Sequence, residues 1–550
     1  MMNHRTIHYP ALLVMAWLVF FILPIGNRGL WAPDEPRYVQ VAWEMWRAKS
    51  YFIPLMNGEI YAEKPPLFFW LVILFSKLFS FETASRWVSA LSALGTILLT
   101  YVLGRQIGNK RLGFTASLVL VTCGLYTWLM TTGNIDTTLT FFTTLSLYFY
   151  LKWDSEKKRS FSILAYGACG LGILAKGPVA LVIPWLVYAL WEIVKHFRGE
   201  GMSLLHLVWG PFVAMAIVSV WLIPACITAG PEYTQTIIFK QNLGRAVKSF
   251  AHVRPWYYYF YTYPFHTLPW FIVFVGALGQ FRRVFAGKGS AFSIVVLWLG
   301  TVFIFFSLLS GKREGYLLPS FPAFSLIIAF IVAKWDELDR SSPWIRIAGV
   351  VGFVTAMVVL TFALSVAFLK EKYPVFGIFP GSLVDWRLWA VCGLGILAMI
   401  LLRKALELAK NRQSQRACNL MAIAMLILAS TCQIYFVPYI DPVKSAKGAC
   451  EEIKAILPAD GTIAFYRKRY DNGWNFYLKR DRIPVINAEE LKQKKLEFDM
   501  IILRKKDLSK FEKAASGSSY KIASTVPIGS KEFVLLKLNL QKEIAARMCF

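Results

Sequence analysis

The chain alternates long apolar blocks with short polar stretches over most of its length. Since a helix needs about 20 apolar residues to cross a bilayer, this pattern predicts thirteen membrane-spanning helices. They are placed at residues 9–25, 87–104, 114–130, 137–151, 161–175, 179–194, 204–224, 264–280, 291–310, 317–333, 347–368, 388–402 and 417–439. All 60 Lys and Arg residues fall outside these segments, and Glu192 is the only acid inside them. Because a charge in hydrocarbon costs about 2.5–3.5 kcal/mol, we expect an all-α polytopic membrane domain.

Composition supports this class and changes how the charge is interpreted. Charged residues make up 17% of the 550 positions, against about 25% in soluble domains. A net charge of +27 would indicate nucleic acid for a soluble protein, but for a membrane protein the expected partners are anionic lipid head groups and phosphates. The eight cysteines form no CxxC motif and no His–Cys cluster, so they predict neither a disulfide framework nor a zinc site.

The loops between the predicted spans fall into two sets that differ in charge. The set on the side of the N terminus comprises residues 1–8, 105–113, 152–160, 195–203, 281–290, 334–346 and 403–416. The opposite set comprises residues 26–86, 131–136, 176–178, 225–263, 311–316 and 369–387. The first set holds more Lys and Arg in roughly half as many residues, and basic loops stay in the cytoplasm. We therefore expect a cytoplasmic N terminus and an external C-terminal region.

Two apolar segments allow more than one interpretation. Leu67–Phe81 is interrupted by Lys77, and counting it as a span would place the basic loop Arg105–Arg111 outside. We therefore expect this segment to lie along the membrane surface or to re-enter it. No A-x-A-like cleavage site follows Tyr9–Ile25, so this block is expected to be a retained first helix rather than a signal peptide.

The chain beyond residue 439 has the residue pattern of a soluble domain. Short β-type runs alternate there with helical stretches. The runs are Thr462–Tyr466, Met500–Leu503 and Phe533–Leu538, and Ser445–Ile456 is a helical stretch. The sequence thus predicts a transmembrane catalytic domain over 1–439, with long outer loops 26–86 and 225–263, and a small α/β domain over 440–550.

Adjacent carboxylates follow the first apolar block, in the sequence Asp34-Glu35-Pro-Arg37-Tyr38. At the membrane surface such carboxylates can accept a proton from an acceptor group, orient it, or hold a cation. The alternative is a structural role at the start of a helix. Asp34 would then cap a helix that begins near the proline, and Glu35 would favour its dipole.

Four further ionisable groups lie close to the expected bilayer face. Tyr61-Ala-Glu63-Lys64-Pro-Pro precedes the surface segment, where a Lys suits a phosphate and Glu63 can position it or bind a metal. The alternative for Lys64 is simple snorkelling. Asp136 and Lys176 lie in very short loops between spans. Ionisable groups at this depth are functional candidates, although either could be merely solvated or paired.

The remaining outer loops add cations and aromatic groups. Arg245, in Asn-Leu-Gly-Arg, offers a guanidinium fork for a phosphate. His252 is a lone histidine, which is more often a structural hydrogen-bonding group than a ligand. Lys312 and Tyr316, in Gly-Lys-Arg-Glu-Gly-Tyr, place another cation and a phenol on the outer face. Each signal is weak alone, but four outer loops present a cation suited to an anionic ligand and two present carboxylates.

Jointly these motifs resemble the bacterial protein-O-mannosyltransferase-like superfamily, and within it most of all the lipid A 4-amino-4-deoxy-L-arabinose transferases. The resemblance runs through at least residues 9–330. It rests on the order of Asp34-Glu35-x-Arg37-Tyr38, Tyr61-x-Glu63-Lys64-Pro-Pro, Asp136, Lys176-Gly, Asn-x-x-Arg245, His252…Pro-Trp-Tyr-Tyr and Gly-Lys312…Tyr316-x-x-Pro. It implies the glycosyltransferase type C fold and an inverting, metal-nucleotide-independent enzyme. Such enzymes move a sugar from a polyprenyl phosphate to an acceptor at the outer face of the inner membrane.

The resemblance also implies residue roles. Asp34 would be the catalytic or acceptor-orienting carboxylate, Asp136 a second essential acid, and Lys64 and Arg245 would hold the carrier phosphate. The matched cavity positions are Glu35, Arg37, Tyr38, Tyr61, Lys176, Lys312 and Tyr316. The positions where a metal such as zinc has been proposed are Glu63 and His252, and no other cofactor is expected.

These roles agree with the chemistry of such a transfer. The polyprenyl phosphate leaves, so cations stabilise charge developing on the bridging oxygen, and a carboxylate stabilises oxocarbenium character at the sugar carbon. Asp34 would orient an acceptor that is already an anionic lipid phosphate, but would have to deprotonate a hydroxyl. The sequence leaves these two cases open.

The expected donor is undecaprenyl phosphate-linked aminoarabinose, and the expected acceptor is lipid A phosphate. This transfer would be a modification of lipopolysaccharide linked to polymyxin resistance. One loop departs from the pattern. Aminoarabinose transferases often carry Gly-Lys-Leu-Pro-Thr-Tyr where this chain has Gly-Lys312-Arg313-Glu314-Gly-Tyr316. Galactosamine, galacturonate, hexose or mannose transfer therefore stays open, as does a protein or glycan acceptor.

Two other classes of protein fit parts of the pattern. A secondary transporter needs internal repeats and ionisable groups deep in its helices, whereas only Glu192 lies within a span here. A polyprenyl-lipid-binding protein or transporter could use the cationic loops but has no need for Asp34 and Asp136. Replacing Asp34 with Asn would separate a transferase from a binding protein. The protein is expected to act as a monomer.

Overall fold

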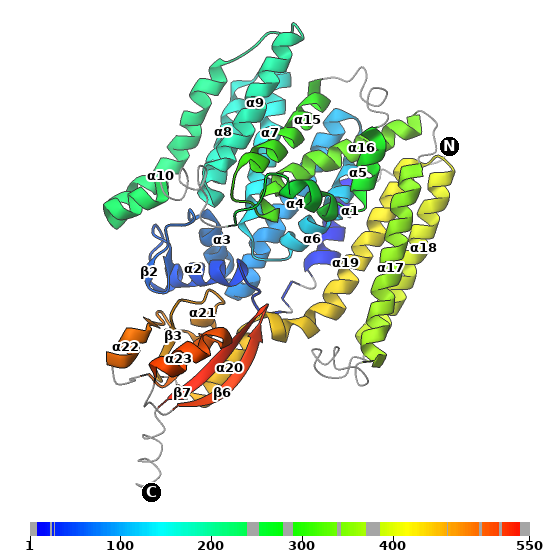
Figure 1. Ribbon diagram of the computed structural model, residues 1–550. Helices are drawn as coiled ribbons and strands as arrows, with labels where there is room; N and C mark the ends of the chain where they lie inside the picture. The colour runs from blue at the N-terminus through cyan, green and yellow to red at the C-terminus, as the bar shows by residue number, and fades with distance from the viewer. Residues whose placement is uncertain are drawn as a thin grey trace.

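The computed structural model describes residues 8–22, 25–26, 28–238, 252–278, 290–337, 343–369, 386–458, 460–493, 498–515 and 520–538. Most of the molecule is a bundle of helices, and a small α/β domain lies against one end of it (Figure 1). The helices of the bundle and its loops are α1 (Tyr9–Trp17), α2 (Glu35–Arg47), α3 (Leu67–Phe75), α4 (Phe81–Ile107), α5 (Lys110–Val121), α6 (Gly124–Met130), α7 (Ile135–Glu156), α8 (Arg159–Lys176), α9 (Val179–Phe197), α10 (Leu205–Gln235), α12 (Tyr258–His266), α13 (Trp270–Leu278), α15 (Ser290–Leu308), α16 (Phe321–Glu337), α17 (Pro343–Leu369), α18 (Trp386–Lys410) and α19 (Ser414–Lys444). A 3-10 helix, η3 (Glu314–Ser320), precedes α16, and a hairpin of β1 (Leu55–Met56) and β2 (Glu59–Ile60) follows α2.

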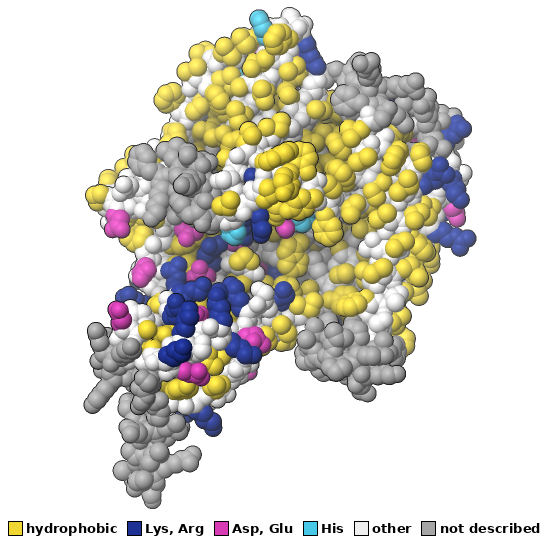
Figure 2. Space-filling view, viewed as in Figure 1, with side chains coloured by type: hydrophobic (Ala, Val, Ile, Leu, Met, Phe, Trp, Pro, Cys, Tyr) yellow, Lys and Arg dark blue, Asp and Glu magenta, His cyan; other side chains and the backbone are white. Residues whose placement is uncertain are grey.

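The all-α membrane domain with a small α/β domain is confirmed. Hydrophobic side chains cover the visible surface of the bundle (Figure 2), as expected of a protein in lipid. In the described part of the chain, seven helices are long and apolar enough to cross a bilayer, or eight if α5 and α6, which meet at 75°, form one bent span. Each of the thirteen predicted spans overlaps a helix, but their number as bilayer crossings stays a prediction.

The surface segment predicted over Leu67–Phe81 is a short helix followed by a turn. Helix α3 has nine residues and reaches about 14 Å, less than half of a hydrocarbon core about 30 Å thick. The next helix, α4, begins at Phe81, where Ser80 caps it by accepting a hydrogen bond from the backbone N–H of Thr83. Helix α3 is therefore too short to cross by itself.

Small residues let the bundle helices pack closely around α4, α7 and α8. A Cβ on Gly104 of α4 would lie 2.6 Å from the Cα of Gly113 in α5, and one on Gly170 of α8 would lie 2.9 Å from the carbonyl of Ala214 in α10. Membrane helices associate through such close contacts because lipid offers no hydrophobic driving force. This packing holds the ends of α7 and α8 at defined positions, where the functional side chains lie.

The C-terminal domain is a five-stranded sheet between two helical layers. Its elements are α20 (Lys447–Ile456), β3 (Ile463–Tyr466), α21 (Trp474–Leu478), β4 (Val485–Ile486), α22 (Ala488–Gln493), β5 (Met500–Arg504), α23 (Leu508–Ala514), β6 (Tyr520–Ile528) and β7 (Lys531–Leu538), with strand order β4-β3-β5-β7-β6. The predicted β-type runs are β3, β5 and β7, and the predicted helical stretch is α20. In β5, Met500 and Ile502 pack on the side of α20 and α21, whereas Ile501 and Leu503 pack on that of α22 and α23. This alternation is the period of two expected of a strand buried on both faces.

The first outer loop is held between the bundle and this domain. Asp441, in the last turn of α19, accepts hydrogen bonds from the backbone N–H of Gly29 (2.9 Å) and the indole N–H of Trp31 (2.6 Å). On α2, Trp43 packs edge-to-face against Phe476 of α21 with ring centroids 6.0 Å apart. Helix α2, which begins directly after Asp34, is thereby fixed in position.

Candidate active site

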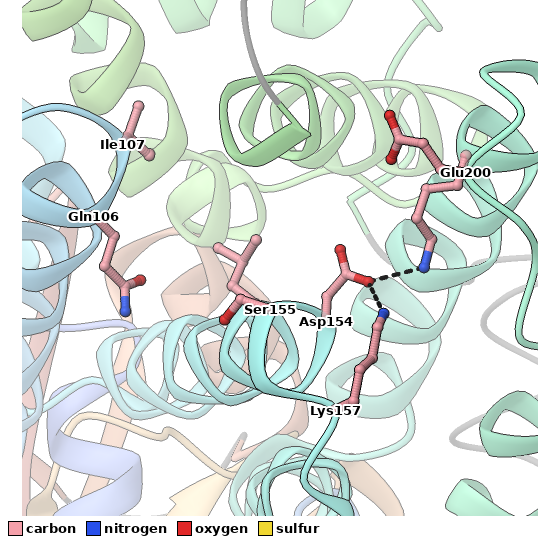
Figure 3. Close-up of a pocket in the computed structure, with 8 residues that line it drawn as sticks. Gln106, Ile107, Asp154, Ser155, Lys157 and Glu200 are labelled. Atoms are coloured by element: carbon pink, nitrogen blue, oxygen red, sulfur yellow. Dashed lines mark hydrogen bonds and ion pairs between the residues drawn. The ribbon is translucent and has the colours of Figure 1, made fainter.

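Polar side chains gather at both ends of α7, about 27 Å apart along the helix. At its C-terminal end a cavity of about 520 Å³ is lined by Gln106, Ile107, Leu151, Asp154, Ser155, Lys157, Lys195 and Glu200 (Figure 3). Its central carboxylate, Asp154, is already paired with Lys157 (2.8 Å) and Lys195 (2.9 Å). None of the described residues predicted to be functional lines this cavity, and most of them gather instead at the opposite end of α7.

Asp34 is the meeting point of two distant segments. It occupies the N-cap position of α2 but makes no capping hydrogen bond, so the alternative of a simple helix cap is wrong. Its carboxylate instead accepts a hydrogen bond from Arg37 (Nη2–Oδ1, 2.6 Å). It also accepts hydrogen bonds from both terminal nitrogens of Arg313, with Nη1 3.1 Å from Oδ1. A buried carboxylate with two guanidiniums is strongly oriented by this fork geometry.

The same contacts set the charge of Asp34. Burial alone would raise its pKa, but the guanidiniums of Arg313 and Arg37 hold the pKa of Asp34 below its usual value. The group is therefore ionised at neutral pH and is a weak proton acceptor. Its geometry suits orientation and electrostatic stabilisation better than general-base catalysis.

Arg37 links Asp34 to the second predicted motif. Its Nη1 lies 3.8 Å from the Glu63 carboxylate, and its guanidinium lies 5.4 Å from the centroid of the Tyr38 ring. Burial raises the pKa of Tyr61, opposed by the nearby Arg37 cation. The Tyr61 hydroxyl and the Arg37 Nε are both buried and have no hydrogen-bond partner among the described residues. Buried polar groups are normally satisfied, so these two atoms mark a place for a water or a ligand.

A second ion pair joins the ends of α7 and α8. Asp136 lies in the first turn of α7, and Lys176, the last residue of α8, donates to its carboxylate. An acid at a helix N-terminus and a cation at a C-terminus are each favoured by the helix dipole. The Lys176 ammonium lies 4.6 Å from the centroid of the Tyr316 ring. A Cβ on Gly315 would lie 2.6 Å from the Asp136 carboxylate, so any other residue at this position would displace that side chain.

The two ion pairs lie near each other. Burial and repulsion from Lys64 and Arg313 lower the pKa of Lys176, which places these three cations near one another. The described cluster therefore contains the predicted residues Asp34, Arg37, Tyr38, Tyr61, Glu63, Lys64, Asp136, Lys176 and Tyr316, with Arg313 added. Its four cations exceed its three carboxylates, which favours an anionic ligand.

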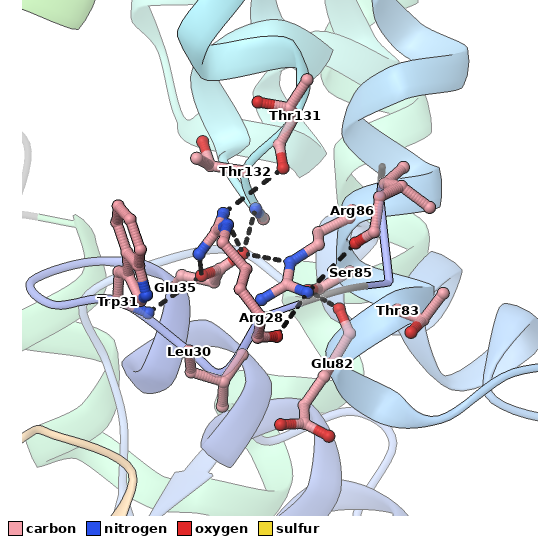
Figure 4. Close-up of polar contacts among 12 residues, drawn as sticks. Arg28, Leu30, Trp31, Glu35, Glu82, Thr83, Ser85, Arg86, Thr131 and Thr132 are labelled. Carbon is pink, nitrogen blue, oxygen red and sulfur yellow. Dashed lines mark hydrogen bonds and ion pairs between the residues drawn. The ribbon is translucent and has the colours of Figure 1, made fainter. Parts of the chain in front are cut away.

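Glu35 is predicted to line the substrate cavity, but its side chain is buried against two arginines outside the cluster of site residues. Its carboxylate is fully buried and accepts from Arg28 (2.7 Å), Arg86 (2.7 Å) and the backbone N–H groups of Trp31 (3.0 Å) and Gly133 (3.1 Å) (Figure 4). Despite this burial, the two arginines lower the pKa of Glu35 to about 2. Both carboxylate oxygens are thus occupied. Glu35 ties the start of α2 to α4 and to the loop before Asp136, and so positions the site rather than contacting a substrate.

Two other described residues predicted for the site, Lys312 and His252, make no side-chain hydrogen bond or ion pair with the described residues of the cluster. The buried Lys312 ammonium donates to the backbone carbonyl of Leu309 rather than to a carboxylate of the site. His252 is exposed, and its backbone carbonyl accepts from the N–H of Lys312 (2.9 Å). Arg245, predicted to bind the carrier phosphate, lies outside the described residues.

The two predicted metal ligands do not fit a divalent cation. No group of three or more His, Cys, Asp or Glu side chains suited to a metal occurs within the described ranges. The Glu63 carboxylate faces Arg37, and partial burial and the neighbouring Arg313 lower the pKa of His252. The arginine beside each of these two residues would repel a further positive charge.

Arg313 is the functional neighbour that the sequence did not single out. The sequence predicts Lys312 and Tyr316 as the site residues of this loop, and Arg313 differs there from the residue that the family often carries. The presence of two consecutive cations, Lys312 and Arg313, is the only feature of the sequence that could have indicated a role for Arg313. Which of them reaches Asp34, 279 positions away, depends on the fold of the loop.

Comparison with known proteins agrees with this geometry. The family described as dolichyl-phosphate-mannose-protein mannosyltransferase matches residues 63–223. A protein of Pseudomonas fluorescens (strain Pf0-1), "Undecaprenyl phosphate-alpha-4-amino-4-deoxy-L-arabinose arabinosyl transferase 1", is 30% identical over 72% of this chain and 72% of its own length. A protein of Pseudomonas aeruginosa (strain UCBPP-PA14), "Undecaprenyl phosphate-alpha-4-amino-4-deoxy-L-arabinose arabinosyl transferase", is 29% identical over 70% of each chain. The crystal structure of ArnT from Cupriavidus metallidurans bound to undecaprenyl phosphate superposes with a TM-score of 0.76 at 18% identity, over 96% of this chain and 97% of that one.

Proposed function

The chain belongs to the membrane glycosyltransferase family of the undecaprenyl phosphate-aminoarabinose arabinosyl transferases, and we propose that it transfers 4-amino-4-deoxy-L-arabinose from undecaprenyl phosphate to a phosphate of lipid A. The proposal places the reaction at the periplasmic face of the bacterial inner membrane. The observation that carries it is the convergence of Asp34, held by Arg37 and Arg313, with the Asp136–Lys176 pair and Lys64.

The donor would be held by the cationic side of this cluster. Lys64 lies close enough to Lys176 to lower its pKa, and Arg245, outside the described residues, is proposed to join them. As the bond between the sugar carbon and the bridging oxygen breaks, its electron pair stays on the carrier phosphate. Cations already in place stabilise that charge without reorganisation, so no general acid is needed to protonate the leaving group.

The acceptor would be oriented by Asp34. An acceptor phosphate is already anionic, and its oxygen attacks the sugar carbon on the face opposite the departing carrier, which inverts the configuration. The low pKa of Asp34 supports this acceptor over a hydroxyl, which would require a base. Asp34 and Asp136 would further stabilise positive charge on the sugar ring.

The topology of the proposal follows from loop charge. The basic loops on the side of the N terminus support a cytoplasmic N terminus. The candidate active site lies at the other end of α7 and α8, and the C-terminal domain lies at that same end through its contacts with the loop before α2. Both would then be periplasmic.

Arg313 lies in the loop that differs from the family pattern, so transfer of a related sugar is the second candidate function. Arg313 contacts Asp34 directly, so this loop borders the space where donor and acceptor meet. The additional positive charge of this loop would favour a donor sugar that carries a carboxylate, such as a uronic acid. Mass spectrometry of lipid A from cells with and without the gene distinguishes these cases. An added aminopentose supports the first proposal, an added hexuronate supports the second, and an unchanged lipid A refutes both.

A substitution separates the transferase from a carrier-binding protein. Asp34→Asn keeps the size of the side chain but removes the charge that orients acceptor and sugar, so turnover should fall at least 100-fold, the scale of losing one preorganised electrostatic group. Binding of undecaprenyl phosphate to the purified variant should stay within about twofold of wild type. If the variant keeps wild-type turnover, Asp34 has no part in the reaction.

A further inference from the structure

The C-terminal domain carries a concentration of cations at one edge of its sheet. Strands β3 and β5 are parallel, so their C-terminal ends meet at the same edge, and β7 runs antiparallel to β5 and begins there, with Arg504 opposite Phe533. We call this surface the basic edge, and its residues are Arg467, Lys468 and Arg469 after β3, Arg504, Lys505 and Lys506 at the end of β5, and Lys531 at the start of β7. Figure 2 shows Lys and Arg side chains gathered on this domain where it meets the bundle.

Fewer carboxylates than cations lie at the basic edge. Three of the seven cations are paired: Arg467 with Asp507 (2.8 Å), Arg469 with Asp471 (3.0 Å) and Lys505 with Glu532 (2.9 Å). The other four have no ion pair among the described residues: Lys468, Arg504, Lys506 and Lys531. Clustered like charges repel one another, so this arrangement gains stability from an anionic ligand.

Lys531 lies near the other three unpaired cations of the basic edge. Partial burial and repulsion from Arg504, Lys468 and Lys506 lower the pKa of Lys531. The Arg504 guanidinium lies 5.8 Å from the centroid of the Tyr470 ring, and its Nε is buried without a hydrogen-bond partner in the described part of the chain. The basic edge therefore carries positive charge that no described carboxylate balances.

The basic edge borders the loop that carries the candidate active site. A terminal nitrogen of Arg469 lies 3.5 Å from the carbonyl of Met56 in β1. A Cβ on Gly473 would lie 3.1 Å from the side chain of Pro36, two residues after Asp34. Asp471 is close enough to contribute to the raised pKa of Tyr61. A head group that reaches Asp34 from outside the membrane would therefore pass beside these cations.

We propose that the basic edge binds a phosphate of the acceptor lipid while a different phosphate of the same head group receives the sugar. The inference rests on the proposed function, because it takes the acceptor to be a phosphorylated lipid, and it goes further in requiring at least two phosphates on that head group. Lys and Arg clusters bind phosphate through charge-assisted hydrogen bonds. The C-terminal domain then serves as the acceptor-docking part of the enzyme.

The test compares two triple variants of the full-length protein. Lys468→Gln/Lys506→Gln/Lys531→Gln removes three unpaired cations of the basic edge. The matched control, Lys454→Gln/Lys513→Gln/Lys521→Gln, removes three exposed lysines from other elements of the same domain, of which Lys521 lies at the far end of β6 beside the pairing of Tyr520 with Leu538. Initial rates are measured with undecaprenyl phosphate-linked sugar and with acceptors that carry one or two phosphates.

The expected result is a rise of at least tenfold in the KM for the diphosphorylated acceptor in the first variant alone. Its kcat, its KM for the donor and its KM for a monophosphorylated acceptor should match the control. Added salt should weaken binding of the diphosphorylated acceptor more in wild type than in the variant, because exposed charges are screened. Equal KM values for the diphosphorylated acceptor in the two variants would overturn the proposal.

A binding measurement keeps this result separate from the proposed function. The detergent-solubilised full chain is titrated with diphosphorylated lipid A or with phosphatidylglycerol in mixed micelles. Weaker binding of lipid A to the basic-edge variant supports docking even if no sugar transfer is detected with any acceptor, an outcome that would refute the transferase proposal alone. Equal loss of binding to both lipids would make the basic edge a general anionic-lipid surface and overturn acceptor docking.

Discussion

Replacing Glu35 with Gln should destabilise the whole protein although the residue lies beside the reacting groups. The two carboxylate oxygens accept from two arginines and two backbone N–H groups. A glutamine would turn its amide N–H₂ towards donors in either orientation, and it would leave Arg28 and Arg86 without a buried counter-charge. Removing one partner of a buried ion pair typically costs about 3–5 kcal/mol.

The pKa of Glu35 leads independently to a similar magnitude. A carboxyl whose pKa falls from 4.5 in the unfolded chain to about 2 in the folded protein adds about 3 kcal/mol to stability at neutral pH. Because the folded pKa is the lower one, this contribution is complete above about pH 4.5 and disappears as the pH falls towards 2. The difference in stability between wild type and Glu35→Gln should therefore shrink as the pH is lowered below 4.5.

Thermal unfolding of the purified protein, followed by tryptophan fluorescence, measures this effect. With an unfolding entropy of about 2.1 cal/mol/K per residue, a loss of about 3 kcal/mol lowers the Tm by about 3 °C if all 550 residues unfold together, and by more if a smaller unit unfolds. Glu59→Gln is the control, since that side chain is 63% exposed and 3.8 Å from Arg482, and its Tm should not change. An unchanged Tm for Glu35→Gln would refute the structural role of this carboxylate.

Two further variants probe the candidate active site itself. Arg313→Leu removes the cation that lowers the pKa of Asp34, so the pKa of Asp34 rises, the acid limb of the kcat/KM profile moves to higher pH, and kcat falls at least tenfold; a wild-type pH profile would contradict this coupling. Lys64→Ala should raise the KM for the polyprenyl donor and lower turnover in initial-rate measurements, because the carrier phosphate loses a counter-charge, and wild-type rates would refute its phosphate assignment.

Local properties of the sequence were enough for the architecture and for several site residues. Long apolar blocks free of Lys and Arg indicate membrane helices because charge is costly in lipid, and the runs of β-type residues around Met500–Leu503 correspond to a strand. Motif order was enough to select Asp34, Lys64, Asp136 and Lys176, which the structure brings to one end of α7. The family follows from the same motifs.

Tertiary structure alone decided which of two neighbouring groups faces the site. Consecutive residues of a helix point about 100° apart, so Asp34 meets Arg37 and Arg313 while Glu35, one position later, is buried against Arg28 and Arg86. The fold also decides that Arg313 contacts Asp34, whereas the neighbouring Lys312 donates to the carbonyl of Leu309. These choices depend on the rotation of α2 and on the approach of a loop nearly three hundred positions away, and neither is set by residues that are close in sequence.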